Sequence, residues 1–316
     1  MGSEKITWTL TTAETFDSYI KESPFKHPFA SSRWSELILA SFGGVCSYLL
    51  GMCKSEVRYL TTCYHNLPWM QPGTFRIGSV GYGGPLPLRE DPATAAFFQD
   101  SSYITSLLTS LKYELNQTLT SVTTFPHKCW NDSFAGLSTT QIIYLPSTHK
   151  EFFEGTVTTN VRTTLRKAKK NHVQVQEVPE SDIGQVHKLL NDTQEEVGAS
   201  YKTSLGFIQN LYRAQDIVKI YGGYHNGMLI AIGVFVFDQT SCFHLFNGWN
   251  RKFRALCANQ LILQTAAEQS INRELRQFNL GESHYDSLVQ AKQRWGARQV
   301  PLLRLTPQLS VKADQS

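Results

Sequence analysis

The dipeptide Asn226-Gly227 is the feature that most constrains the fold of this chain. Both residues tolerate positive φ angles, and this pair is the strongest short signal for a two-residue hairpin turn. Runs typical of strands lie on either side of it at 217–222 and 228–237, and a third follows at 242–248. These runs predict three antiparallel strands in the second half of the chain.

The elements expected around these strands alternate between strand and helix. Ser181 and Asp182 are suitable capping groups for the helix that begins after them. The long helix is indicated by apolar residues at helical spacing in a stretch without Pro or Gly. The remaining elements, in chain order, are a strand at 173–176, helices at 183–190 and 205–213, the long helix at 256–274, a short strand at 278–281, a helix at 287–295 and a last strand at 300–305 that closes this half.

The first half repeats this order without residue-level similarity. Helices are expected at 12–19, 33–39 and 93–115, with a break at Gly43-Gly44, and strands at 6–10, 47–53, 56–64, 76–82, 121–125 and 141–145. A duplicated fold is the simplest interpretation. We therefore expect an α/β (α+β) protein of two tandem domains, 1–148 and 149–316, each a mixed, mostly antiparallel sheet flanked by helices.

Composition excludes several classes of protein. With 316 residues, 41% of them apolar, the chain can bury two cores. No run approaches the roughly 18 to 20 apolar residues that span a bilayer, and the N-terminus does not resemble a secretory signal, so a cytoplasmic location is expected. The six cysteines form no C-x-x-C pair, and neither they nor the histidines fall at metal-ligand spacing, so no metal or redox cofactor is implied.

The net charge of +4 belongs to the second half, because residues 1–150 carry equal numbers of basic and acidic side chains. This excess suits a polyanionic ligand such as a nucleotide or the acceptor end of an RNA. A solvated basic face is an equally good explanation.

Four segments in order along the chain resemble the FemAB-like branch of the GNAT acyltransferase superfamily. They are Pro28–Trp34 (PFASSRW), Gly81–Pro85 (GYGGP), the basic helix Asn160–Lys170 (NVRTTLRKAKK), and Phe278–Gly281 (FNLG) followed by Lys292–Ala297 (KQRWGA). The order of predicted elements in the second half is also that of a GNAT domain. The resemblance extends over residues 28–297.

The resemblance implies tandem GNAT-type domains and transfer of an acyl or aminoacyl group to an amine, forming an amide. The second domain would bind the donor and the first would contribute to the acceptor site. The donor would be an aminoacyl-tRNA, or alternatively an acyl-CoA with a small molecule or a saccharide precursor as acceptor. No tightly bound cofactor and no DNA partner are implied. A non-catalytic member that only binds a ligand remains a further alternative.

The candidate catalytic residues follow from this resemblance. Lys292 matches the family lysine that precedes a Trp-Gly pair, and its charge would stabilise the oxyanion of a tetrahedral intermediate. Glu282 or His284, just after the short strand, is a candidate base for the attacking ammonium. Ser283 has no G-x-S-x-G context and is not expected to act as a nucleophile. Each of these residues is also explained as a solvated polar side chain.

Donor-binding residues are expected around the short strand, the long helix and the basic helix. The segment 249–255 lacks the glycines with which acetyl-CoA-dependent GNAT enzymes bind pyrophosphate, which favours a tRNA-borne donor. The candidates for donor binding are Gly281, Ser283, Arg251, Arg254, Asn259, Arg162 and Arg166. The candidates for acceptor binding, in the first domain, are Arg33, Trp34, Tyr82, Gly83 and Gly84. Exposed basic loops and core aromatics are the alternatives.

Overall fold

A computed structural model describes residues 6–131, 134, 137–199, 201–283 and 285–305 of the protein. The chain divides into two compact units. One contains the residues up to Ser138 together with those from Pro301 onward, and the other contains Thr139–Val300. The first break lies ten residues before the expected boundary at 148. None of the helices in the described part of the chain has the length and hydropathy needed to cross a membrane.

The first unit is built on one mixed sheet. Its strands run in the order β1-β2-β3-β4-β6-β13, and β5 pairs with β3. The elements are β1 (Ile6–Thr11), α1 (Ala13–Glu22), η1 (Pro28–Ala30), α2 (Ser32–Phe42), β2 (Val45–Cys53), β3 (Glu56–His65), β4 (Thr74–Ile77), β5 (Leu86–Pro87), α3 (Pro92–Gln99), α4 (Ser101–Leu115), β6 (Thr118–Thr123) and β13 (Arg298–Leu305). β4 and β6 are parallel, whereas the other pairs described here are antiparallel.

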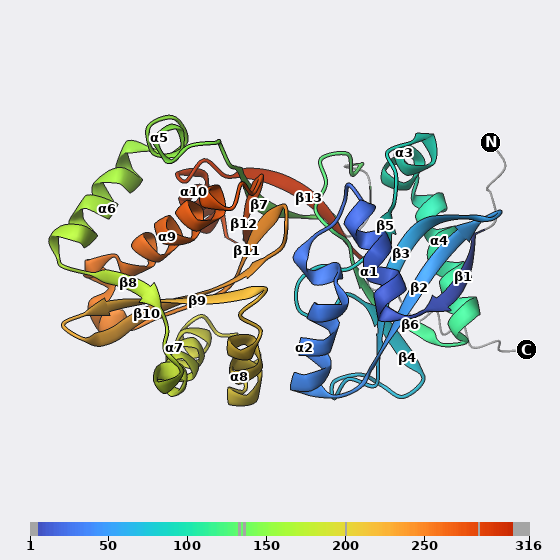
Figure 1. The fold of residues 1–316 in the computed structure, drawn as a ribbon, viewed down its shortest axis with the longest axis horizontal. Coiled ribbons are helices and arrows are strands. Elements are labelled where there is room, and N and C mark those ends of the chain that lie inside the picture. The colour runs from blue at the N-terminus through green and yellow to red at the C-terminus, as the bar shows by residue number, and fades with distance from the viewer. Residues whose placement is uncertain (1–5, 132–133, 135–136, 200, 284, 306–316) are drawn as a thin grey trace, which may run out of the picture. The chain divides into compact units, whose positions relative to one another are not determined.

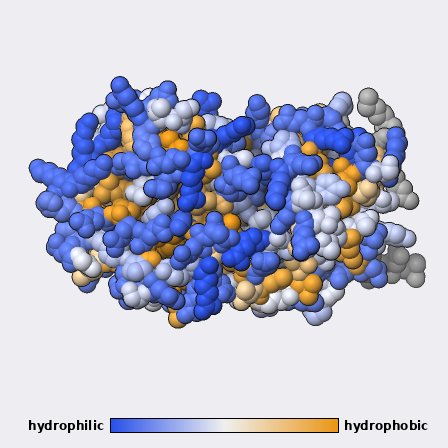
Figure 2. Space-filling view, in the orientation of Figure 1, coloured by the Kyte–Doolittle hydropathy of each residue, from blue (hydrophilic) through white to orange (hydrophobic). Residues whose placement is uncertain are grey.

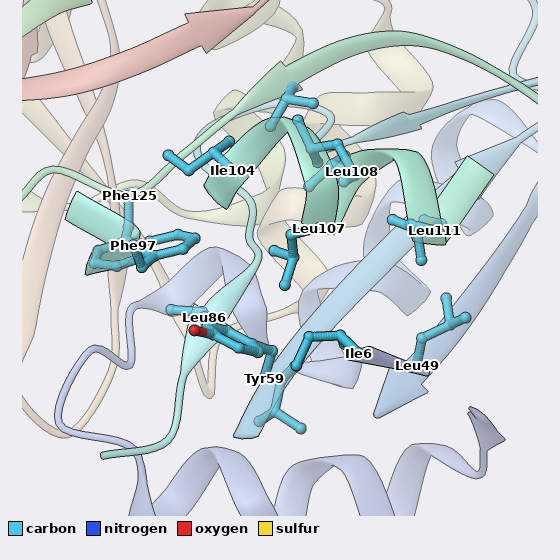
Figure 3. Packing of buried hydrophobic residues seen from close by; sticks show 14 of the residues in the cluster. Ile6, Leu49, Tyr59, Leu86, Phe97, Ile104, Leu107, Leu108, Leu111 and Phe125 are labelled. Carbon is cyan, nitrogen blue, oxygen red and sulfur yellow. The ribbon is translucent and has the colours of Figure 1, made fainter. Parts of the chain in front are cut away.

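The core of the first unit lies between its sheet and α4. Ile104, Leu107, Leu108 and Leu111 recur at helical spacing and are buried against the apolar faces of the strands. Figure 3 shows Leu107 and Leu111 facing Ile6, Leu49 and Tyr59. The helix begins at the cap residue Asp100, whose carboxylate accepts a hydrogen bond from the Ser102 N–H, and it ends at Asn116 in the left-handed conformation.

The strands of the second unit follow one another in the order β8-β9-β10-β11-β12-β7. Its elements are β7 (Leu137–Tyr144), α5 (His149–Glu151), the π-helical turn η2 (Phe152–Thr156), α6 (Thr159–Lys170), β8 (Gln174–Glu177), η3 (Glu180–Asp182), α7 (Ile183–Glu196), α8 (Leu205–Arg213), β9 (Val218–His225), β10 (Met228–Phe237), β11 (Ser241–Trp249), η4 (Arg251–Leu256), α9 (Ala258–Asn272), β12 (Gln277–Glu282) and α10 (Asp286–Gln293). Helices α6, α9 and α10 cover one face of these strands, and α7 and α8 cover the other (Figure 1).

The predicted hairpin is confirmed. Asn226 and Gly227 have φ angles of 51° and 76°, and β9 and β10 pair antiparallel across them. The strand at 228–237 and the helix at 205–213 are present with the expected ends. The strands expected at 173–176, 217–222, 242–248 and 278–281 and the helices at 183–190 and 287–295 are present with shifted ends. The spacing of apolar residues was sufficient to predict these elements, because each of them buries one face against a neighbouring element.

Two strands pair differently from the prediction. The last strand was expected to close the second half. Residues 298–300 of β13 do belong to the second unit, but Arg304 and Leu305 pair with Thr123 and Val122 of β6 in the first unit. Conversely, β7 was assigned to the first half, but its residues from Thr140 to Tyr144 pair with β12 in the second unit. Strand pairing is set by register and packing between distant segments, which local periodicity does not contain.

Two local predictions were also wrong, and the predicted long helix is present with a shifted start. The strand expected at 76–82 ends at Ile77, because Gly78 and Gly81 adopt φ angles of 79° and 93°. The long helix begins at Ala258 rather than 256, since Cys257 lies in the left-handed region. The side chain of Asp182 does not cap α7; its Oδ2 instead accepts a hydrogen bond from the Tyr224 hydroxyl at 2.9 Å.

Candidate functional site

The strands β11 and β12 separate part of the way along their length. They are parallel and pair only at Ser241–Phe243 with Gln277–Asn279. Beyond that point β11 continues to Trp249 and β12 to Glu282 without pairing to each other. The backbone groups that face this opening are therefore not used by the β11–β12 ladder.

The end of β12 is fixed by the buried side chain of Asn279. Its Oδ1 accepts hydrogen bonds from the Gly281 N–H at 2.8 Å and from the Thr140 hydroxyl at 2.8 Å. Gly281 has a φ angle of 77°, a conformation that glycine adopts at little cost. A side chain there would find space, since the atom nearest to an added Cβ would be the His244 carbonyl oxygen at 3.7 Å.

Lys292 reaches this point from α10. Its Nζ donates hydrogen bonds to the carbonyl oxygens of Gly281 at 3.0 Å and of Glu282 at 2.8 Å. An ammonium group has three N–H donors, so one remains for a ligand. Burial lowers the pKa of Lys292 to about 8, and the negative charge of Glu282 opposes this shift. The ammonium form is thus populated at neutral pH but is easily deprotonated.

Helix α10, which carries Lys292, is held in place by the residues that follow its C-terminal end. The Trp295 indole N–H donates to the Gln260 Oε1 at 3.0 Å, which ties the end of α10 to the first turn of α9. Gly296 has a φ angle of 85°, and a Cβ there would lie 2.2 Å from the Thr156 methyl group. The Trp-Gly pair after Lys292 therefore has a structural role that sets the position of the lysine.

His244 on β11 is a site residue that the sequence did not single out. Its ring stacks on Phe235 with centroids 4.9 Å apart. Burial, and secondarily the charge of Lys292, lower the pKa of His244 to about 3, so the imidazole is neutral at physiological pH. The parallel pairing of β11 with β12 brings it near Lys292, although a histidine between Phe243 and Leu245 in a predicted strand was a visible signal.

Glu282, the last residue of β12, and Ser283, which follows it, lie in different environments. Glu282 is partly buried beside Lys292, whereas the Ser283 hydroxyl donates to the Gln141 Oε1 at 2.6 Å. That hydrogen bond is directed towards Gln141 on β7 and not towards Lys292. His284 lies outside the described residues.

The segment between β11 and α9 forms the 3-10 helix η4. Asn250 Oδ1 caps it by accepting from the Lys252 N–H at 3.1 Å, and Cys257 then adopts a φ angle of 60° before α9 begins. Arg254 is exposed, and Arg251 forms an ion pair with Glu196 at 3.3 Å. In the first turn of α9, the buried Oδ1 atom of Asn259 has no hydrogen-bond partner within the described chain.

The basic helix α6 presents most of its charges to solvent. Val161, Leu165 and Ala168 are buried as the sequence predicted, and Arg166 is exposed. Arg162 differs from the other cations because its guanidinium turns back and donates to the backbone carbonyls of Phe153 and Val157, the former at 2.9 Å. Its hydrogen bonds hold η2 in place.

In the first unit the predicted acceptor residues have unequal exposure. Trp34 is 1% exposed, and its indole N–H donates to the Val80 carbonyl at 3.1 Å; Tyr82 is 4% exposed. Both rings pack edge-on against Phe29. Arg33 is on the surface and pairs with Glu36 at 3.5 Å. Of the five candidates, Arg33 alone carries a charged and exposed side chain.

Gly83 and Gly84 lie where the chain passes close to other backbone. A Cβ on Gly83 would lie 2.5 Å from the Gly78 nitrogen, and one on Gly84 would lie 2.9 Å from the Leu60 carbonyl oxygen. His27 Nε2 donates to the Gly83 carbonyl at 3.2 Å. Glycine is required at these two positions by close packing against the backbone of Gly78 and of Leu60 on β3.

The part of the chain that contains the opening between β11 and β12 is similar in sequence to a known family. Residues 156–287 match the sequence family described as an acetyltransferase (GNAT) domain. This region contains β11, β12 and the opening between them. No curated protein is significantly similar in sequence.

The fold is similar to several solved structures at low sequence identity. FemX is 11% identical with a TM-score of 0.67, covering 93% of this chain and 96% of that one. A tandem GNAT protein from the clavulanic acid biosynthesis pathway is 11% identical with a TM-score of 0.54, covering 95% and 98%. The C-terminal domain of a putative lysylphosphatidylglycerol synthetase from Agrobacterium fabrum is 10% identical with a TM-score of 0.50, covering 93% and 92%. The chain thus has a FemAB-like fold of tandem GNAT-type domains, and with its GNAT acetyltransferase domain it is an acyltransferase.

Proposed function

We propose that this acyltransferase moves an aminoacyl group from an aminoacyl-tRNA to an amine acceptor, forming an amide bond. The observation that carries the proposal is the Lys292 ammonium, held by two backbone carbonyls at the point where β12 leaves β11. A fixed cation at this opening suits a reaction in which negative charge develops on a carbonyl oxygen.

The proposed chemistry assigns a role to each group near the opening. The acceptor ammonium loses a proton to Glu282, and its nitrogen attacks the ester carbonyl carbon, so that a C–N bond forms. The free N–H of Lys292 donates to the resulting oxyanion. The C–O bond to the tRNA ribose then breaks, the amine loses its second proton, and the ribose oxygen gains one. His284 remains the alternative base.

The residues divide between donor and acceptor in this proposal. Gly281, Ser283 and Asn259 would border the donor in the second unit, with Arg251, Arg254 and Arg166 as contacts for its phosphates. Arg162 would act indirectly, through η2. In the first unit Arg33 would contact the acceptor, whereas Trp34, Tyr82, Gly83 and Gly84 would shape the loop beside it. An aminoacyl-tRNA donor would place the protein in the cytoplasm.

One observation favours acyl-CoA as a second candidate donor. Cys257 adopts the left-handed conformation, φ 60°, at the start of α9, and its side chain does not cap the N–H groups of the first turn. Free N–H groups at a helix N-terminus bind phosphate well. The structural neighbour from the clavulanic acid pathway is described with reference to AcCoA.

A donor assay separates the candidates. Purified protein is titrated with acetyl-CoA, with longer acyl-CoAs and with a mixed pool of charged tRNA, and transfer to an added amine mixture is followed by mass spectrometry. Amide formation from charged tRNA alone supports the proposal. Amide formation from an acyl-CoA alone would replace it with the second candidate, and binding without transfer would identify a ligand-binding protein.

A further inference from the structure

Two basic segments of the second unit lie in long stretches without acidic residues. There is no Asp or Glu between Glu154 and Glu177, which includes α6, and none between Asp238 and Glu268, which includes η4. Seven cations on these segments have exposed side chains. One of them, Arg251, forms an ion pair with Glu196, and the other six are Arg166, Lys167, Lys169, Lys170, Lys252 and Arg254. No acidic side chain is adjacent in sequence to neutralise them.

The fold brings the two segments together. His225, at the end of β9, donates from Nδ1 to the Asn171 carbonyl at 3.1 Å, directly after the last turn of α6. The same ring lies 6.4 Å from the ring of Phe253 in η4. Val173 and Phe253 also pack on one hydrophobic core. The C-terminal turn of α6 and η4 are therefore neighbours, separated by one histidine.

The six cations are not neutralised by the rest of the described chain. None of them forms an ion pair there, whereas Arg251, next to them in η4, is paired with Glu196. Val161, Leu165 and Ala168 face the core, so the charged side chains of α6 are directed outward. In Figure 2 the edge of the second unit that carries α6 is covered mainly by hydrophilic residues.

We propose that this surface, formed by the last turns of α6 together with η4 and called here the α6–η4 surface, binds the phosphodiester backbone of the RNA donor. The proposal rests on the proposed function and extends it by locating the body of the RNA. η4 begins at Arg251, two residues after the end of β11, and β11 is one of the two strands that border the opening near Lys292.

Charge number and spacing favour RNA over a coenzyme. Six cations on two separate elements exceed the phosphates of one CoA molecule. RNA offers a phosphate at every nucleotide, so it can engage both elements together. Such binding releases condensed counterions, and the logarithm of the affinity falls with the logarithm of salt concentration by about 0.7 to 0.9 for each phosphate neutralised.

The test measures binding of uncharged tRNA by fluorescence anisotropy over a series of salt concentrations. The variant K169Q/K170Q/K252Q removes three charges from the α6–η4 surface. The control K188Q/K202Q/R276Q removes three exposed charges elsewhere in the same unit. We expect the surface variant to weaken binding at least tenfold at low salt and to reduce the salt slope by about two. The control should change neither quantity by a comparable amount.

Two results would overturn the inference. One is an equal loss of tRNA affinity in both variants, which would reflect net charge alone. The other is charge-dependent binding to equimolar phosphatidylcholine–phosphatidylglycerol vesicles without binding to tRNA, which would assign the surface to a membrane.

A short aminoacylated RNA with only the acceptor-end nucleotides separates docking from chemistry. The surface variant should use this short donor as well as the wild type does, while its KM for intact charged tRNA rises. No transfer by the wild type from either donor would refute the proposed function, whereas the tRNA-binding data would still decide the role of the α6–η4 surface.

Discussion

The ammonium of Lys292 and the carbonyl oxygen of Gly281 are 3.0 Å apart, and this hydrogen bond joins α10 to the end of β12. Replacing Lys292 with Ala removes the cation and leaves α10 anchored through Trp295. We expect turnover to fall at least tenfold, since loss of one oxyanion donor typically costs about a hundredfold or more. The thermal unfolding midpoint should change little. Unchanged single-turnover rates would remove Lys292 from the mechanism.

The pH dependence of transfer reports the charge of Lys292. Its pKa is lowered to about 8, so the ammonium form is lost as pH rises through about 8. If the cation stabilises the oxyanion, the rate should decline above that pH. The substitution Lys292→Arg retains a charge over the whole range. The ratio of wild-type to variant rates should therefore fall above about pH 8, and a ratio that rises instead would indicate that the neutral amine acts as a base.

Gly281 and Gly227 form a matched pair for testing the opening between β11 and β12. Their φ angles are 77° and 76°, and a Cβ added at Gly281 would have its nearest neighbour at 3.7 Å, whereas one at Gly227 would meet no described atom within 4 Å. Alanine at either position should cost about 1 kcal/mol in the free energy of unfolding, because the left-handed conformation disfavours a side chain. Only Gly281→Ala should also reduce kcat/KM. Equal activity of the two variants would mean that the donor does not pass Gly281.

His27 should make the protein less stable in acid. Burial lowers its pKa from 6.5 to about 4, with the Gly83 hydrogen bond opposing the shift. The unfolded state therefore binds more protons between these values, so the stabilisation is present above about pH 6.5 and is lost as pH falls towards 4. The loss is about 3 kcal/mol at most. Urea unfolding at pH 7 and pH 4 should show a smaller difference for His27→Gln, and an identical difference would exclude His27.

The predictable part of this protein is local. The hairpin at Asn226-Gly227 follows from two residues that accept positive φ, and α6 follows from Val161, Leu165 and Ala168 at helical spacing. The candidate site was located by Lys292 and Gly281 because the resemblance of their segments to FemAB-like proteins survives at low identity. Each of these inferences needs only neighbours in sequence.

Tertiary structure decided what joins distant segments. It paired β7 with β12 and the end of β13 with β6, it brought His244 towards Lys292, and it turned Arg162 from the solvent to the carbonyls of η2. It also placed the last turn of α6 beside η4. The physical reason is that sequence periodicity determines which face of an element is buried, whereas the partner of that face depends on packing and register over the whole unit.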